Sequence, residues 1–148
     1  MKTKGIILLL LLVIVTSLGL SACAKTDDEK VLDAVHAYID ALNREDIAAA
    51  QAATHRQAMN YFYLKDQLQM NFALYDTQVT LEKLDFVGIT DGLATVDFVM
   101  TTIKTDQSDF KDNRVKGQFT LKKQDDQWKI FDTIYDPTTD IEFLTPQP

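Results

Sequence analysis

The stretch EKVLDAVHAYIDALNR, residues 29–44, predicts a long amphipathic helix at the start of the folded domain. Its apolar positions recur at steps of three and four residues and form one stripe: Val31, Leu32, Val35, Tyr38, Ile39 and Leu42. Polar side chains fall on the other side of the same helix: Glu29, Asp33, His36 and Asp40. Asp27 or Asp28 can cap the first turn. We therefore expect this helix to bury one face against the rest of the domain.

Two further helices are expected before residue 76. The segment Asn43–Asp46 interrupts the first helix, and Asp46 is a suitable N-cap for a short alanine-rich helix over residues 47–53. A third helix is expected from Gln57 to Tyr75, because apolar residues there again recur at helical steps. These inward-facing residues are Tyr61, Leu64, Leu68, Phe72 and Tyr75. Their rings are expected to belong to the core.

After Asp76 the apolar pattern changes to a period of two, which predicts β-strands. Four strands are expected, over residues 79–89, 94–101, 115–122 and 128–135. Asp91-Gly92 predicts a tight hairpin between the first two strands, since this pair adopts the positive φ angles that such a turn needs. Helices first and antiparallel strands afterwards indicate an α+β domain.

The last strand carries a carboxylate in an apolar pattern. Trp128, Ile130, Asp132 and Ile134 alternate along one face of the expected strand, with Phe131 and Tyr135 on the other. A carboxylate on an apolar face is costly unless it is paired or reaches water. Asp132 is therefore a candidate pocket residue, with Arg114 or a lysine of a neighbouring strand as its partner. The alternative is a strand-end residue in solvent.

The N-terminus predicts export. Lys2 and Lys4 precede an apolar run over residues 6–15, which is shorter than the roughly 20 residues of a membrane-spanning helix. The ending Leu20-Ser21-Ala22-Cys23 resembles a bacterial lipobox, which implies cleavage before Cys23 and lipidation of its thiol. The expected plan is a lipoprotein signal peptide (1–22), a lipid-anchored tether (23–27), one domain (28–135) and a C-terminal tail (136–148). We expect the protein on the extracytoplasmic face of a cell membrane.

The amino-acid composition restricts the classes of partner, metal and cofactor that we expect. Removal of the signal peptide takes Lys2 and Lys4 away and lowers the formal net charge from −7 to −9, which argues against nucleic acid. Cys23 is the only cysteine, so the mature domain has no disulfide. His36 and His55 fit no zinc-ligand spacing, and glycine-rich phosphate loops are missing. No metal or cofactor is expected.

Three segments together resemble the nuclear transport factor 2-like superfamily: YIDALNRED (38–46), the hairpin around Asp91-Gly92, and FTLKK with WKI (119–130). The resemblance implies a cone, in which a strongly curved antiparallel sheet wraps around the helices and leaves a pocket at its open end. The expected pocket residues are Tyr38, Tyr61, Phe72, Phe98, Trp128 and Asp132. The superfamily contains ketosteroid isomerases, scytalone dehydratases, polyketide cyclases and non-enzymatic binding domains. Lipoproteins of this kind are frequent in Gram-positive bacteria, so that envelope is favoured over a Gram-negative one.

The same resemblance implies a possible catalytic role for Tyr38, as donor of a hydrogen bond to a developing oxyanion. The alternative is a core tyrosine. Isomerases add an aspartate base between helices and sheet, but residues 59–64 contain no carboxylate. His55 is a candidate general base in a dehydratase-like reaction, and its alternative is an exposed loop histidine.

The leading interpretation is a non-catalytic domain that binds a small apolar or amphipathic ligand in the cone, or an envelope protein on the sheet face. The first alternative is an isomerase, dehydratase or cyclase that uses Tyr38 with His55 or Asp132. The second alternative is a structural accessory domain in envelope assembly. A weak homodimer through the outer sheet face, near Phe131 and Tyr135, is also expected.

Overall fold

The computed structural model describes residues 25–144, so the signal segment and Cys23 lie outside the described residues. Three helices come first within this range: α2 (Asp27–Asn43), α3 (Ile47–Ala53) and α4 (Tyr61–Leu74). The strands follow as β1 (Thr77–Thr90), β2 (Leu93–Lys104), β3 (Asn113–Gln124), β4 (Gln127–Ile134) and β5 (Ile141–Phe143). The α+β prediction is confirmed. None of the helices within residues 25–144 is long and apolar enough to span a membrane.

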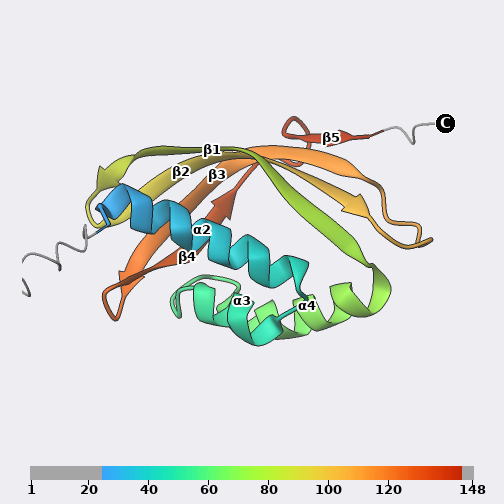
Figure 1. Ribbon diagram of the computed structural model, residues 1–148, viewed down its shortest axis with the longest axis horizontal. Coiled ribbons are helices and arrows are strands. Elements are labelled where there is room, and N and C mark those ends of the chain that lie inside the picture. The colour runs from blue at the N-terminus through green and yellow to red at the C-terminus, as the bar shows by residue number, and fades with distance from the viewer. Residues whose placement is uncertain (1–24, 145–148) are drawn as a thin grey trace, which may run out of the picture.

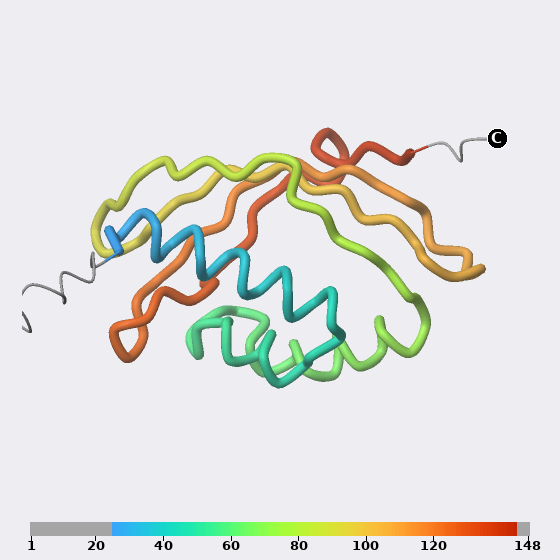
Figure 2. Tube along the Cα trace, viewed as in Figure 1, coloured from blue at the N-terminus to red at the C-terminus, as the bar shows by residue number. Residues whose placement is uncertain are grey.

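All five strands form one antiparallel sheet in the order β1-β2-β3-β4, with β5 paired to the start of β3. The sheet arches over α2, and α3 and α4 lie beyond α2 on the helical side (Figure 1). Figure 2 traces the same path and shows the β1–β2 and β3–β4 hairpins curling down around α2. The C-terminal segment therefore contributes to the sheet, where Ile141 packs against the core.

The helices begin where the sequence predicts, except at the starts of α2 and α4. Thr26, and not Asp27 or Asp28, is the N-cap of α2, and its backbone N–H donates to the Glu29 carboxylate at 2.9 Å. Asp46 caps α3 as predicted, since its Oδ1 accepts the Ala49 N–H at 2.9 Å. Helix α4 begins at Tyr61 rather than Gln57, because the chain first makes a turn in which the Ala58 N–H donates to the His55 carbonyl at 2.9 Å.

The concave face of the sheet is filled by side chains. Val31, Val35 and Ile39 of α2 are buried against a layer that the central strands provide: Ala94, Val96, Phe98, Phe119 and Leu121. The Phe98 and Phe119 rings stack with centroids 4.4 Å apart, and Tyr38 meets Phe119 edge-on at 6.5 Å. A second, smaller cluster joins the helices through Ala41, Ala50, Leu64 and Leu68. The interior of the cone is thus a packed core.

Bulges curve the sheet and change the predicted faces of β4. In the β3–β4 pair, Leu121 lies opposite Ile130 but Thr120 lies opposite Asp132, so Phe131 is an extra residue. Trp128 and Ile130 are buried as predicted. Beyond the bulge the alternation reverses, and Asp132 shares the outer side with Thr120. The prediction that Asp132 and Ile134 face inward with Trp128 and Ile130 is therefore wrong.

Gly117 marks a close approach between β3 and its neighbours. A Cβ atom at this position would lie 2.6 Å from the Ile134 carbonyl oxygen and 2.9 Å from Cζ of Phe98. The predicted Asp91-Gly92 hairpin is confirmed, with φ values of 52° and 78°. Gly117 thus serves packing, whereas Gly92 serves turn geometry.

Candidate functional site

A small cavity of about 200 Å³ lies beside Tyr38, where the cone expected from the family resemblance would hold a ligand. Its lining combines helix, loop and β4 residues: Tyr38, Thr54, Met59, Asn60, Ile130, Phe131, Asp132 and Thr133. Burial raises the pKa of Tyr38, so its hydroxyl stays protonated at neutral pH. The Asp132 side chain is exposed and accepts the backbone N–H of Thr133 at 2.8 Å. The structure therefore brings Tyr38 and Asp132 to one small cavity.

His55 is buried, with 6% of its surface exposed, so the alternative of an exposed loop histidine is wrong. Its backbone N–H donates to the Ile130 carbonyl at 2.7 Å, and its Nδ1 accepts the Gln57 N–H at 3.0 Å. Its ring meets Phe131 edge-on at 5.6 Å. Burial, with a smaller contribution from the Lys122 charge, lowers the pKa of His55. These contacts fasten the loop between α3 and α4 to the edge of β4, and His55 is not among the residues that line the Tyr38 cavity.

The six expected pocket residues do not line one cavity. Phe98 is 2% exposed inside the core, and Phe72 lines a separate hollow with Tyr75 and Phe110. Trp128 lines a hollow beside α2, and Tyr61 lines a different pocket beside α3. The expected partner of Asp132 is also engaged elsewhere, because Arg114 Nε lies 2.8 Å from the Glu82 carboxylate. The physical reason is that Phe98 and Phe119 fill the cone and leave the remaining residues around its edge.

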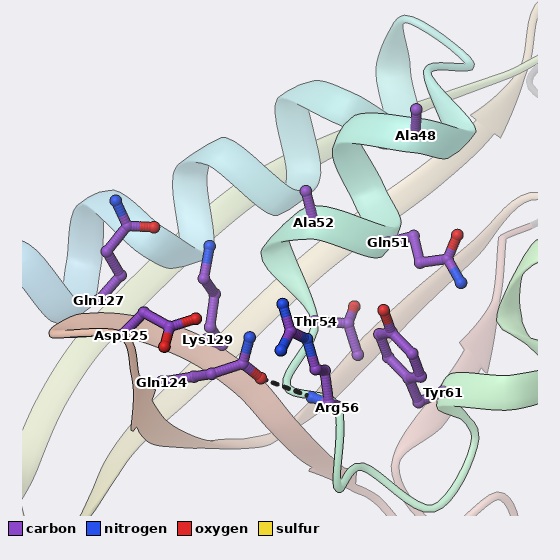
Figure 3. A pocket seen from close by; sticks show the side chains of 10 residues that line it. All are labelled: Ala48, Gln51, Ala52, Thr54, Arg56, Tyr61, Gln124, Asp125, Gln127 and Lys129. Atoms are coloured by element: carbon purple, nitrogen blue, oxygen red, sulfur yellow. Dashed lines mark hydrogen bonds between the residues drawn. The ribbon is translucent and has the colours of Figure 1, made fainter.

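A larger pocket, of about 450 Å³, lies between α3 and the turn that joins β3 to β4 (Figure 3). We call it the α3 pocket, and its lining residues are Ala48, Gln51, Ala52, Thr54, Arg56, Tyr61, Gln124, Asp125, Gln127 and Lys129. The Arg56 and Lys129 side chains extend toward the helices, and the Arg56 backbone N–H donates to Oε1 of Gln124 at 2.9 Å (Figure 3). Alanines on α3 leave room beside them.

The α3 pocket brings two cationic side chains, Arg56 and Lys129, to one place. Within residues 25–144, neither Arg56 nor Lys129 forms an ion pair. Three carboxamides and the Tyr61 hydroxyl add hydrogen-bonding groups, and Asp125 adds one carboxylate. Arg guanidinium and Lys ammonium groups form charge-assisted hydrogen bonds with carboxylates and phosphates. The arrangement can therefore hold a small anion that also carries hydroxyl or amide groups.

Trp128 lies in a hollow of about 340 Å³ between α2 and the same β3–β4 turn, and Gln127 and Lys129 line both this hollow and the α3 pocket. The Trp128 side chain is 6% exposed, its Nε1 is buried, and no group in the described part of the chain hydrogen-bonds to it. The Lys123 ammonium lies 4.9 Å from the centre of its ring. This buried indole N–H is therefore an unsatisfied donor inside the domain, and it does not open into the α3 pocket.

Sequence reasoning missed Arg56 and Lys129 as site residues. Arg56 follows His55 directly, but no spacing in the sequence connects it with Lys129 in β4. Charge gives no signal either, because other cations in residues 25–144, among them Lys65 and Lys104, also form no ion pair.

One family model matches residues 33–144, and its description is "Anti-sigma-I factor RsgI9, C-terminal domain". A curated relative, Anti-sigma-I factor RsgI9 of Acetivibrio thermocellus, is 33% identical over 103 residues. That match covers 67% of this chain and spans 14% of the relative's length.

Solved structures agree on the fold. A ketosteroid isomerase-like protein from Erwinia carotovora atroseptica superimposes with a TM-score of 0.60 at 17% identity, over 83% of this chain and 100% of that one. A domain of unknown function with a cystatin-like fold from Nostoc punctiforme gives 0.55 at 20% identity, over 73% and 75%. The resemblance to nuclear transport factor 2-like proteins is thereby confirmed for the fold. With most of its residues matched by the family model, the chain belongs to the family of the C-terminal domain of anti-sigma-I factor RsgI9.

Proposed function

We propose that the protein is a lipid-anchored, extracytoplasmic binding domain without catalytic activity, and that the α3 pocket is its ligand site. The single observation that carries the proposal is the contrast between a cone filled by stacked Phe98 and Phe119 and an open pocket with two unpaired cations. A filled cone leaves little room for a substrate beside Tyr38. The ligand that fits the α3 pocket is a small anion with additional hydrogen-bonding groups.

Anchoring rests on the segment Leu20-Ser21-Ala22-Cys23, which resembles a lipobox. Two acyl chains on one cysteine hold a protein stably on a membrane, whereas one chain binds only marginally. Mass spectrometry of the N-terminus of membrane-extracted protein should show an acylated Cys23 as the first residue. An unmodified Cys23 would contradict the anchor.

The relationship to an anti-sigma-I factor supports a regulatory use of this binding domain. The relative is much longer than this chain, so its other segments have no counterpart in the match. We propose that ligand occupancy at the α3 pocket is reported to a membrane-associated partner protein. Co-purification of the lipidated protein from its own membrane, with and without Arg56→Gln, would identify a partner that depends on the pocket.

Calorimetric titration with single carboxylates and with inorganic phosphate tests the ligand site. Arg56→Gln and Lys129→Gln should each weaken binding of the best anion at least tenfold, because each removes a charge-assisted hydrogen bond worth about 1.5–3 kcal/mol. Arg44→Gln is the matched control, since Arg44 is exposed at the C-cap of α2 and does not line the pocket. Unchanged affinity in both pocket variants would contradict the proposal.

An enzyme that uses Tyr38 is the second candidate, and the observation in its favour is the cavity that Tyr38 shares with Asp132. Proton abstraction needs a base within hydrogen-bond reach of the substrate, and the exposed Asp132 carboxylate is already engaged by the Thr133 N–H at 2.8 Å. We expect no turnover of ketosteroids or other enolisable carbonyl compounds. Turnover that Tyr38→Phe abolishes would establish the enzyme instead.

A further inference from the structure

Helix α4 has two apolar sides, and only one of them is covered. Leu64 and Leu68 are buried against Ala41 of α2 and Ala50 of α3. A second set remains exposed, which we call the outer stripe: Met59 (95% exposed), Phe62 (81%), Tyr63 (68%), Met70 (58%) and Leu74 (56%). At about 100° per residue, the four members within α4 fall in roughly one third of the helix circumference. Met59 lies in the turn just before the helix.

An exposed stripe of this size indicates a contact surface. Single exposed apolar residues are ordinary, but contiguous apolar patches on soluble proteins mark binding sites for proteins or membranes. A helix that needs only its core contact carries one apolar side. The outer stripe is therefore expected to have an occupant.

Charge favours a membrane as that occupant. The mature chain is strongly acidic, yet from Ile47 to Tyr75 the only carboxylate is Asp66, against the cations Arg56 and Lys65. Anionic lipid head groups repel acidic surfaces and attract basic ones. With one carboxylate against two cations, the α3–α4 segment is not repelled by an anionic bilayer in the way that the acidic chain as a whole is.

The length of the tether also favours a membrane, and this step rests on the proposed lipid on Cys23. Only Ala24, Lys25 and Thr26 separate Cys23 from the first residue of α2. At about 3.5 Å per extended residue, the tether reaches no more than roughly 15 Å. The domain must therefore lie close to the bilayer, and one of its faces must turn toward it.

The position of Asp66 argues against a second copy of the chain as the occupant of the outer stripe. It lies between Phe62 and Met70 in helical position, near the middle of the outer stripe. A two-fold pairing of α4 with its copy would bring the two Asp66 carboxylates together and away from water, which is unfavourable. At a bilayer the stripe needs to reach only the head-group level, where a carboxylate stays hydrated.

We propose that α4 lies on the membrane surface through its outer stripe and thereby orients the anchored domain. Phe62 and Tyr63 enter the interfacial region, where aromatic side chains are favoured. The lipid on Cys23 supplies the attachment, and α4 supplies the orientation.

Quenching by brominated lipids tests the proposal on the full-length, processed protein in vesicles of phosphatidylethanolamine and phosphatidylglycerol. Met70→Trp places an indole on the outer stripe, and Val87→Trp is the matched control, because these residues are 58% and 59% exposed and Val87 lies in β1. Trp128 is 6% exposed and provides the shared background. We expect at least threefold stronger quenching of the Met70→Trp protein than of the Val87→Trp protein.

Equal quenching of the two variants would overturn the membrane contact. Absence of quenching at position 70 together with a doubled mass in light scattering would also overturn it, and would assign the outer stripe to a second copy of the chain. The N-terminal mass of the same samples separates the two proposals. A lipidated Cys23 without quenching at position 70 overturns only the role of α4. An unmodified Cys23 with quenching at position 70 overturns only the lipid anchor.

Discussion

The inside of the curved sheet and the outside of the α3–α4 layer use the same residue types in opposite ways. Phe119 is 1% exposed and stacks on Phe98, whereas Phe62 is 81% exposed on α4. Inside, aromatic rings fill the space in which the sequence predicted a ligand pocket. Outside, apolar side chains and unpaired cations face solvent. The comparison assigns the apolar core to the sheet interior and supports the proposal that binding occurs on the helical side.

The largest expected effect on stability is the difference between truncating a buried phenylalanine and truncating an exposed one. Phe119→Ala should lower the free energy of unfolding by about 3–5 kcal/mol, since it leaves a cavity in the core. Phe62→Ala should change it by less than about 0.5 kcal/mol, because no core contact is lost. Urea denaturation of both variants measures the difference. Similar losses in the two variants would show that the outer stripe is part of the core.

A smaller effect is expected at the tightest point of the sheet. Gly117→Ala should cost about 1–3 kcal/mol, because the added Cβ would lie 2.6 Å from the Ile134 carbonyl oxygen and must displace β4. Gln118→Ala, on the outer side of the next position, is the control and should cost less than about 0.5 kcal/mol. Thermal unfolding compares them, and an unaffected Gly117→Ala protein would contradict the close packing of β3 on β4.

The pH dependence of stability tests the burial of His55. Burial and Lys122 lower its pKa below the ordinary 6.5, so the unfolded chain takes up this proton first as the pH falls. The stability that neutral His55 contributes is complete above about pH 6.5 and is lost as the pH falls through its folded-state pKa. His55→Asn, whose side-chain oxygen can still accept the Gln57 N–H, should flatten this part of the profile. An unchanged slope between pH 5 and 7, measured by urea unfolding, would place His55 in solvent.

The smallest expected effect on stability concerns helix α3, which forms one side of the α3 pocket. Asp46→Ala removes the N-cap of α3 and should cost about 1 kcal/mol. Asp40→Ala, which changes an exposed carboxylate within α2, is the control and should be close to neutral. Circular dichroism during thermal unfolding measures both. Equal melting temperatures for the Asp46→Ala protein and the wild type would mean that the cap does not hold α3.

Most of the fold could be predicted from the sequence because its patterns are local. The stripe of residues 29–44, the Asp46 cap and the Asp91-Gly92 hairpin each depend on neighbouring residues only. The β4 bulge could not be predicted, since Phe131 is displaced by pairing with β3 and by packing against the distant His55. That one extra residue turned Asp132 and Ile134 to the outer side.

The candidate site was harder to predict for the same reason. Tyr38 and Asp132 do line one cavity, but the cone interior beside it is filled by Phe98 and Phe119, which stack across two strands. Arg56 and Lys129 come from a loop and from β4, and contacts such as the bridge between Thr54 and Ile130 and the ring contact of His55 with Phe131 bring those segments together. A site whose residues are brought together by such long-range contacts has no characteristic residue spacing in the sequence.

Mapping of amide chemical shifts by NMR tests the division between a filled cone and an open α3 pocket most directly. The unlipidated mature chain, residues 24–148, would be titrated with small carboxylates and inorganic phosphate. We predict shift changes concentrated at Arg56, Gln124 and Lys129, and their loss in the Arg56→Gln protein. Shift changes concentrated instead at Tyr38, Ile130 and Asp132 would place the ligand in the cone and contradict the account.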